Sequence, residues 1–327
     1  MQVETVIKAF IERFDTFLRH RSVPDHFDEQ GREKMVRMVR RFVEAGQTIE
    51  LLLPGFPHKN PNLTKVLGHL PDLGEKLALE RLKYFCASIS ELYCPQGAEV
   101  GCRVTIFADG RVWGDLLGVS SENIASYQAG LRALPELRPY VRFHSLSEHF
   151  EEFQAGREGK AQQALEQHWE SPEALAQLER SLGFDPDASA EDLDFDRIRV
   201  FERFTMLVRE DRHWTKETCE AEIMSVCREA ARKMMVRHAA FSSLLARAYP
   251  QHIRLSIHAS SNAGPKYSIR LFEHSEDCFL PYHCTLVKFG ERFVPMRRDE
   301  AEKLPGGVEV VRTSKGQPWY LLAKTAR

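Results

Sequence analysis

Apolar residues recur at three- and four-residue steps along much of the chain, the spacing that places them on one face of a helix. Near the start, for example, Val6, Ile7, Phe10 and Phe14 fall on one such stripe. The periodic segments predict helices over residues 3–18, 32–45, 72–92, 121–134, 197–211 and 216–248.

Short apolar runs between these helices predict strands at residues 48–53, 100–108 and 141–143. Strands that alternate with helices are typical of an α/β protein whose sheet is at least partly parallel. The first half of the chain is therefore expected to form a Rossmann-like core sheet with helices.

Residues 253–258 alternate strictly between apolar and polar side chains, and the alternation resumes over residues 266–271 after a turn-rich loop. In a strand this period places every second side chain on the same face. We expect the two runs to pair as a hairpin, whose polar face would carry Arg254, Ser256, His258, Lys266, Ser268 and Arg270. Such a face suits a phosphate or carboxylate, because a guanidinium group binds either through paired hydrogen bonds. The alternative is the solvated face of a half-buried antiparallel sheet, which alternates in the same way.

The middle of the chain differs in composition, because residues 150–195 are rich in Glu, Gln and Ala. Within this segment, Ser171 and Gly183 are expected to cap a helix at its start and its end. Further strands are expected at residues 285–289, 308–312 and 319–322, so the C-terminal third should be α+β. These features divide the chain into a Rossmann-like α/β portion (1–150), a variable helical or loop insertion (151–196), and a helical and β-hairpin portion that completes the ligand site (197–327).

Composition narrows the classes of function. A chain of 327 residues with a formal net charge of -2 is not typical of a general nucleic-acid or membrane-surface binder. Its first residues lack the basic and apolar regions of a signal peptide, and no apolar run is long enough to span a bilayer, so we expect a soluble cytoplasmic protein.

Several common motifs are absent from the sequence. There is no C-x-x-C pair among the seven cysteines, no P-loop, no dinucleotide fingerprint, no H-E-x-x-H and no G-x-S-x-G. His274 and Glu276 match two ligands of an iron facial triad, but so short a match occurs by chance, and no metal site is expected.

A proline-rich loop, residues 54–62, follows the first predicted strand, where ligands bind in open α/β sheets. Its three prolines would stiffen it and fix His58 and Lys59 in position. The alternative is an ordinary connecting loop. His283 precedes a later strand and would lie near the cationic face if that strand joins the same sheet, although a lone histidine is more often structural.

A second loop, residues 109–115, follows the next strand and offers Asp109, Arg111 and Asp115 around two glycines. A carboxylate there could hold a substrate ammonium or act as a base. The alternative is a tight turn with a surface Arg–Asp pair.

Three sequence blocks resemble the isocyanide (isonitrile) synthases of the pyoverdine/dityrosine biosynthesis family. The blocks are residues 52–62 with 65–68 and 70–72, residues 107–115, and residues 253–258 with 264–271. They lie in the family's order within residues 51–283, so the resemblance covers most of the chain.

This resemblance implies a definite reaction. The α-amine of an aromatic amino acid, tyrosine first and tryptophan second, is converted to an isocyanide. The carbon comes from the C2 carbonyl of ribulose 5-phosphate, a co-substrate that condenses with the amine to an imine. No cofactor or metal is implied, and the product is expected to pass to an iron/2-oxoglutarate oxygenase of the same pathway.

The chemical needs of that reaction suggest roles for the candidate residues. Arg254, Lys266 and Arg270, with Ser256, could bind the sugar phosphate. Arg111 or Lys59 could bind the amino-acid carboxylate, and His58 is a further candidate for substrate binding. His258 or His283 could shuttle protons near neutral pH. Asp109 or Asp115 could deprotonate the amine, and the sequence leaves these alternatives open.

Two other functions compete with this interpretation. One is a different phosphosugar-using lyase with Lys59 or Lys266 as a Schiff-base lysine. The other is a non-catalytic anion-binding protein whose basic face contacts nucleic acid. The nearly neutral charge and the lack of aromatic residues on the cationic face argue against nucleic acid.

Overall fold

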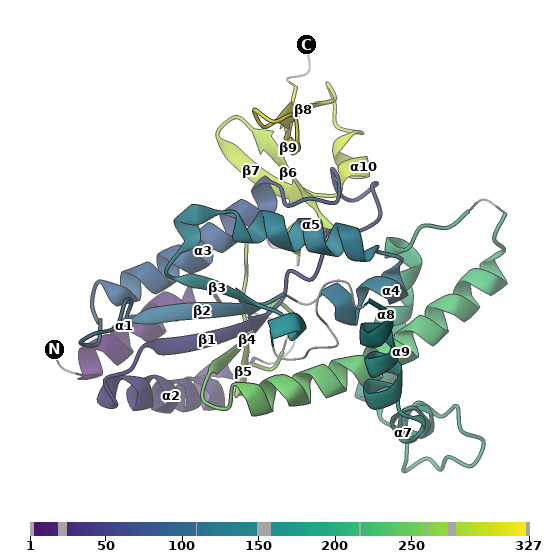
Figure 1. The fold of residues 1–327 in the computed structure, drawn as a ribbon, viewed down its shortest axis with the longest axis horizontal. Helices are drawn as coiled ribbons and strands as arrows, with labels where there is room; N and C mark the ends of the chain where they lie inside the picture. Colours follow the sequence, from purple (N-terminus) through teal and green to yellow (C-terminus); the bar gives the residue numbers. More distant parts are fainter. Residues whose placement is uncertain are drawn as a thin grey trace.

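A five-stranded parallel sheet lies at the centre of the protein (Figure 1). The computed structural model describes residues 3–18, 25–108, 110–148, 158–215, 217–258, 260–273 and 279–324. The sheet has the order β3-β2-β1-β4-β5, and every neighbouring pair is parallel. Its strands are β1 (Ile49–Pro54), β2 (Cys102–Phe107), β3 (Val141–His144), β4 (Ile253–Ser256) and β5 (Lys266–Ser268). The predicted α/β class is confirmed.

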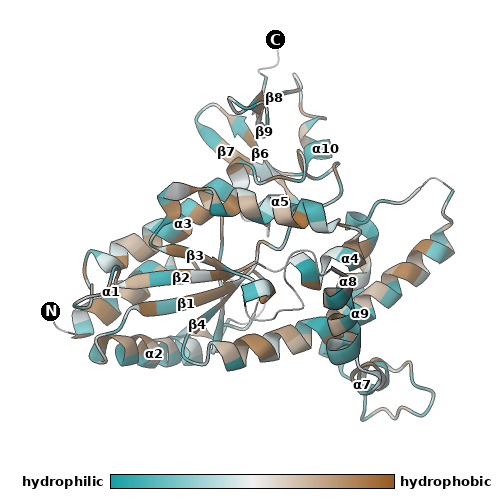
Figure 2. Ribbon diagram, in the orientation of Figure 1, coloured by the Kyte–Doolittle hydropathy of each residue, from teal (hydrophilic) through white to brown (hydrophobic). Residues whose placement is uncertain are grey.

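Helices cover both faces of this sheet, which explains why β1 carries apolar side chains on both faces. Leu51 and Leu53 of β1 pack into a core cluster that contains residues of α1, α2 and α3. Leu52 points to the other face and packs with Phe241 and Leu245 of α9. In Figure 2 the central strands are mostly hydrophobic, whereas the helices mix hydrophobic and hydrophilic residues. The covering helices are α1 (Val3–Asp15), α2 (Arg32–Glu44), α3 (Leu73–Ser90), α5 (Ser121–Arg132) and α9 (Glu220–Ala248).

The predicted hairpin at residues 253–271 is wrong, because β4 and β5 run parallel. Arg254 is in register with Lys266, and Ser256 with Ser268, so each pair still shares a face as expected. Alternation fixes which side chains share a face but carries no information on the direction of the neighbouring strand. The loop between the strands, residues 257–265, is long enough to return the chain to the start of a parallel neighbour.

A helical layer lies beyond the ends of β1 and β2 in Figure 1. Its helices are α4 (Gly114–Leu117), α6 (Glu158–Ala164), α7 (Pro172–Leu182) and α8 (Phe195–Asp211), together with part of α9. The predicted caps of α7 are confirmed: the Ser171 hydroxyl accepts the N–H of Ala174, and Gly183 adopts a left-handed conformation with φ of 73°.

A second, four-stranded sheet forms the C-terminal part, with the order β7-β6-β9-β8. Its elements are β6 (Thr285–Phe289), β7 (Arg292–Met296), β8 (Val308–Arg312) and β9 (Pro318–Ala323), with the short helix α10 (Arg298–Ala301) after β7. The expected strands at 285–289, 308–312 and 319–322 are confirmed. The sequence did not predict β7, which contains Pro295 and lies at the sheet edge, where a proline is tolerated.

The parallel sheet combines β1–β3 from the first predicted portion with β4 and β5 from the last. The portion boundaries at residues 150 and 196 stay a prediction. Among the helices that the structure describes, none is long and apolar enough to cross a membrane.

Candidate active site at the carboxyl ends of the parallel strands

A cavity of about 140 Å³ lies where β1 and β2 end and where the chain leaves β4. Its walls are aromatic and aliphatic, and four imidazoles face it. The lining includes Pro54, Phe107 and Ile257 at the strand ends, Trp113, Leu117, Phe204, Leu207, Met234 and Phe241 on the helical side, and His58, His238, His258 and His283.

The two loops singled out by sequence pack against each other at this cavity. The N–H of Gly55 donates to the Phe107 carbonyl at 3.3 Å. A Cβ on Gly110 would lie 2.3 Å from the Pro57 carbonyl oxygen, so only glycine allows this approach. The expected neighbourhood of the 54–62 and 109–115 loops is confirmed.

Lys59 is fully buried in a carboxylate cage beneath the first loop. Its ammonium donates to Asp72 Oδ2 at 2.8 Å, to both oxygens of Glu75 at 2.8 Å, and to the Pro281 carbonyl at 3.0 Å. Burial alone would lower the pKa of Lys59, but the two carboxylates outweigh it and raise that pKa. Asp72 and Glu75 also form the capping box of α3, so the cage ties the loop to a helix start. This arrangement gives Lys59 a structural role and does not favour a Schiff base.

A cationic pair without carboxylate partners lies on the α9 side of the sheet. Arg254 and Lys266 are register neighbours on β4 and β5, and Arg254 Nη2 donates to the Ser242 hydroxyl at 3.1 Å. Arg254 Nε is buried without a hydrogen bond, and no carboxylate in the described parts of the chain pairs with either cation. Burial lowers the pKa of both side chains, and the Arg254 charge lowers that of Lys266 further.

His238 links this cationic pair to the cavity. Desolvation is the main cause that lowers the pKa of His238 to about 4, and the nearby charges of Lys266 and Arg254 lower it further. The residue lines the cavity and is exposed there. An anion held by the cationic pair would therefore lie next to the cavity.

His58 is 4% exposed, and its Nδ1 lies 3.0 Å from the Lys59 carbonyl oxygen. That contact places the proton on Nδ1, because a carbonyl only accepts. Nε2 is buried without a partner among the described residues. Burial lowers the pKa of His58 to about 4, so its ring is neutral at physiological pH.

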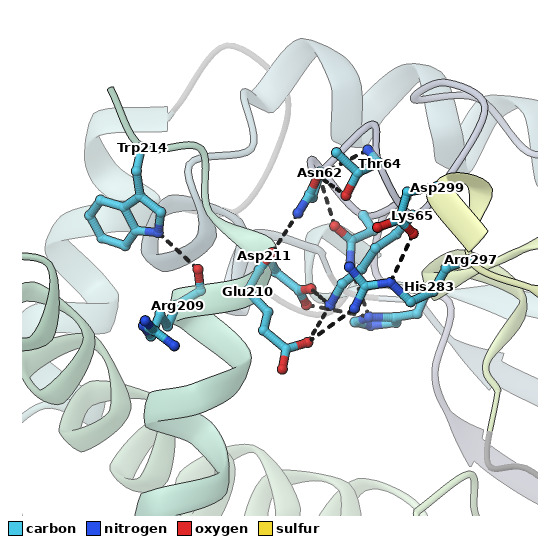
Figure 3. A network of polar contacts seen from close by, with 11 residues as sticks. Asn62, Thr64, Lys65, Arg209, Glu210, Asp211, Trp214, His283, Arg297 and Asp299 are labelled. Carbon is cyan, nitrogen blue, oxygen red and sulfur yellow. Dashed lines mark hydrogen bonds and ion pairs between the residues drawn. The ribbon is translucent and has the colours of Figure 1, made fainter. Parts of the chain in front are cut away.

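The buried carboxylate of Asp211 lies next to the His283 ring (Figure 3). Its Nδ1 lies 3.3 Å from Asp211 Oδ2 and 3.0 Å from Asn60 Nδ2. Asp211 is 1% exposed and accepts from Lys65 Nζ at 2.7 Å. Burial raises the pKa of Asp211, but His283 and Lys65 lower it by more, so the carboxyl is ionised. Sequence reasoning missed Asp211, because nothing in its spacing at the end of a helix points to a site.

His258 is exposed and lies past the end of β4, so it lines the cavity from a bend and not from the strand. The Ser256 hydroxyl donates to the His258 carbonyl at 3.0 Å and accepts its N–H at 3.1 Å. Ser256 therefore shapes the bend that presents His258.

The remaining candidates lie outside the cavity lining. Asp115 forms two hydrogen bonds, of 2.7 and 2.9 Å, with the fully buried Arg237, which also binds Glu170. Sequence reasoning missed Arg237 and Glu170, which sit in regular helical patterns.

Arg111 lines a separate cavity of about 240 Å³ with Arg132 and two serines. Arg270 lies past the end of β5 and near Arg81 of α3, so its expected place on the face of Arg254 and Lys266 is wrong. Burial lowers the pKa of Arg81, and the charge of Arg270 lowers it further. Asp109 lies outside the described residues, as do His274 and Glu276.

A larger groove of about 690 Å³ lies between α1, α3 and the C-terminal sheet, lined by Arg81, Tyr84 and Phe293 among others. It contains none of the candidate residues and lies away from the carboxyl ends of the parallel strands. No group of three or more potential metal-ligating residues occurs in the part of the chain that the structure describes.

Comparisons with known proteins identify a family and a solved structure that match most of this chain. A family model described as pyoverdine/dityrosine biosynthesis protein matches residues 39–308. L-tyrosine isonitrile synthase from Pseudomonas aeruginosa is 32% identical over 98% of this chain and 95% of its own length. L-tryptophan isonitrile synthase from Fischerella ambigua is 29% identical over 86% of this chain and 80% of its own length. The crystal structure of PvcA from Pseudomonas aeruginosa has a TM-score of 0.83 at 28% identity and covers 98% of this chain and 100% of that chain.

Proposed function

Since this chain belongs to the pyoverdine/dityrosine biosynthesis family, we propose that it is an isocyanide synthase. Its substrate is an aromatic amino acid, tyrosine first and tryptophan second. Ribulose 5-phosphate supplies the isocyanide carbon, which makes the enzyme a carbon–carbon lyase. The product then passes to an iron/2-oxoglutarate oxygenase.

This proposal rests on one observation: His238 lies between two sites. On one side lies an aromatic cavity, and on the other a cationic pair, Arg254 and Lys266, that no carboxylate of the described residues neutralises. Two half-buried cations without a counter-ion favour a ligand that brings negative charge. A sugar phosphate has that charge, and its carbonyl would then lie toward the cavity.

The aromatic wall suits the other substrate. The rings of Phe107 and Phe241 pack edge to face with centroids 5.5 Å apart, and Trp113 lies 6.4 Å from Phe241. A tyrosine or tryptophan ring can join such a cluster with further edge-to-face contacts. The cavity is smaller than the roughly 300–1,000 Å³ of an ordinary ligand pocket.

The imidazoles supply the acid–base chemistry. The substrate ammonium must lose a proton before the amine attacks the ketone, and the hydroxyl that leaves on imine formation must gain one. His258 and His283 face the cavity and are the candidates for these transfers. Asp109 stays a candidate from sequence alone.

The proposal is tested by incubating the purified protein with tyrosine or tryptophan and ribulose 5-phosphate labelled with ¹³C at C2. Mass spectrometry should find an isocyanide that carries the label, and omission of either substrate should abolish it. If neither amino acid gives an isocyanide while a fully folded protein is present, the proposal is wrong.

A second candidate function rests on Lys266. Burial lowers its pKa, which increases the fraction of free amine and favours a Schiff base with a sugar phosphate. Borohydride reduction in the presence of ribulose 5-phosphate would then attach the sugar to Lys266. An isocyanide synthase of the proposed kind forms its imine on the amino acid and should show no such adduct.

A further inference from the structure

We propose that Asp211 is a positioning residue of the active site: it keeps a proton on Nδ1 of His283, so that Nε2 exchanges protons with the substrates. The inference rests on the proposed function and deepens it by separating the roles of the cavity histidines.

The first argument is an unsatisfied carboxylate oxygen. Oδ1 of Asp211 accepts from Lys65 at 2.7 Å, whereas Oδ2 is buried and forms no hydrogen bond with any described residue. The ring nitrogen Nδ1 of His283 lies 3.3 Å away in an ion-pair contact, and a small rotation of the ring would align it to donate to Oδ2. A proton on Nδ1 would satisfy Oδ2, and a bare Nδ1 would face it with a lone pair.

Asn60 competes for the same ring nitrogen. Its Oδ1 accepts the N–H of Asn62 at 2.8 Å, which turns its Nδ2 toward His283 Nδ1 at 3.0 Å. Asn60 can donate only to an unprotonated Nδ1, so the two arrangements exclude each other.

Magnitudes decide between the two arrangements. Loss of the neutral Asn60 hydrogen bond costs about 1 kcal/mol, whereas a buried charged oxygen left unpaired costs more than about 1–3 kcal/mol. The Asp211 arrangement is therefore favoured. Its contact of 3.3 Å is long, and catalytic hydrogen bonds often tighten only in the complex with substrate.

A polar network holds Asp211 in this place (Figure 3). Lys65 binds both Asp211 and Glu210, at 2.7 and 2.8 Å, and the Asn62 amide donates to the Glu210 carbonyl at 2.6 Å. Arg297 lies 3.7 Å from Glu210. These contacts join the last turn of α8 to the loop that carries His58 and Lys59. The Asp211 carboxylate is therefore fixed in position relative to the His283 ring.

The other deep histidine cannot replace His283 as a base. The pKa of His58 is about 4, so its neutral ring takes up a proton only at acid pH. His283 instead takes the proton of the substrate ammonium on Nε2, which leaves a free amine and an imidazolium whose Nδ1–H points to Asp211. The same proton returns to the carbinolamine hydroxyl, which leaves as water when the imine forms.

Kinetics test the proposal with Asp211→Asn, His283→Gln and the double variant, and with Asp299→Asn as the control. Asp299 belongs to the same network but pairs with Arg297 at 3.2 Å. We expect Asp211→Asn to lower kcat about a hundredfold with little change in KM. The double variant should be no slower than His283→Gln, because the carboxylate acts through the ring. The Asp299→Asn control should keep wild-type rates.

The pH profile adds a readout that a merely structural role would not move. The titratable and charged groups near His283 are the neutral His58 and the charged Lys65, Glu210, Asp211 and Arg297, and among the described residues Asp211 is the one that forms an ion-pair contact with Nδ1. Without its counter-ion the imidazolium is less stable, so the acidic limb of the kcat/KM profile should move to lower pH in Asp211→Asn. Additive losses in the double variant, or an unshifted limb, would overturn the proposal.

A measurement on the wild type covers the case in which Asp211→Asn does not fold. Nitrogen NMR of ¹⁵N-histidine-labelled protein reports which ring nitrogen of neutral His283 carries the proton. The proposal expects Nδ1, and a proton on Nε2 would overturn it. If the wild-type protein forms no isocyanide, the proposed function is wrong. The measurement of the His283 tautomer remains valid in that case.

Discussion

Two cationic centres, Lys59 and the pair of Arg254 and Lys266, differ in their counter-ions. Lys59 is wholly buried and is surrounded by Asp72, Glu75 and a carbonyl. Arg254 and Lys266 are half-buried, and no described carboxylate pairs with them. The first cation is neutralised by buried carboxylates, as expected of a structural ion pair, whereas our proposal assigns the second centre to the binding of an anionic substrate.

The largest effect should follow from substitution of Lys59. Lys59→Met leaves two carboxylates buried without their cation, which should lower the free energy of unfolding by about 3–5 kcal/mol. Urea denaturation measures this loss. A variant of unchanged stability that no longer forms product would show instead that Lys59 is catalytic.

Acid should destabilise the protein through His58. Its folded pKa of about 4 lies below the ordinary value of 6.5, so the unfolded chain binds more protons between these pH values. Stability is then complete above pH 6.5 and falls by roughly 3 kcal/mol as the pH drops toward 4. His58→Gln should flatten this decline, and His213→Gln, an exposed control, should not. Equal slopes in unfolding experiments for wild type and His58→Gln would contradict the assignment.

Substitution of Arg254 should weaken the binding of the sugar phosphate. Arg254→Ala should weaken ribulose 5-phosphate by about 2 kcal/mol, roughly thirtyfold, because a charge-assisted contact is lost. Amino-acid affinity should change little. Equal losses for both substrates would point to misfolding or to another role for Arg254.

The smallest effect is expected for Lys266→Met, measured by the same urea denaturation as Lys59→Met. Removal of a cation that pairs with no carboxylate of the described residues should change the unfolding free energy by less than about 1 kcal/mol. A loss as large as that of Lys59→Met would mean that Lys266 has a structural counter-ion and would remove the contrast.

The sequence predicted the parts of this arrangement that depend on local pattern. Strands β1 and β2, helices α1–α3, the caps at Ser171 and Gly183, and the neighbourhood of the two loops all follow from periodicity and turn chemistry. Asp72 and Glu75, three residues apart before a helix, carry the capping signature that could have located the partners of Lys59.

What the sequence missed depends on tertiary contacts. The direction of β5 is invisible in an alternating pattern. Asp211 and Lys65, far apart in the sequence, meet only because α8 ends against the first loop. Nor could spacing show that Asp115 forms an ion pair with the buried Arg237.

The central claim is that the unneutralised pair Arg254 and Lys266 holds the phosphate of the carbon donor. Isothermal titration calorimetry of ribulose 5-phosphate against wild type and against the double variant Arg254→Ala/Lys266→Met tests it most directly. We predict that the double variant loses at least about a hundredfold in affinity for the sugar phosphate, as expected for two charge-assisted contacts, while tyrosine binds as in wild type. Undiminished binding of ribulose 5-phosphate to the folded double variant would contradict the account.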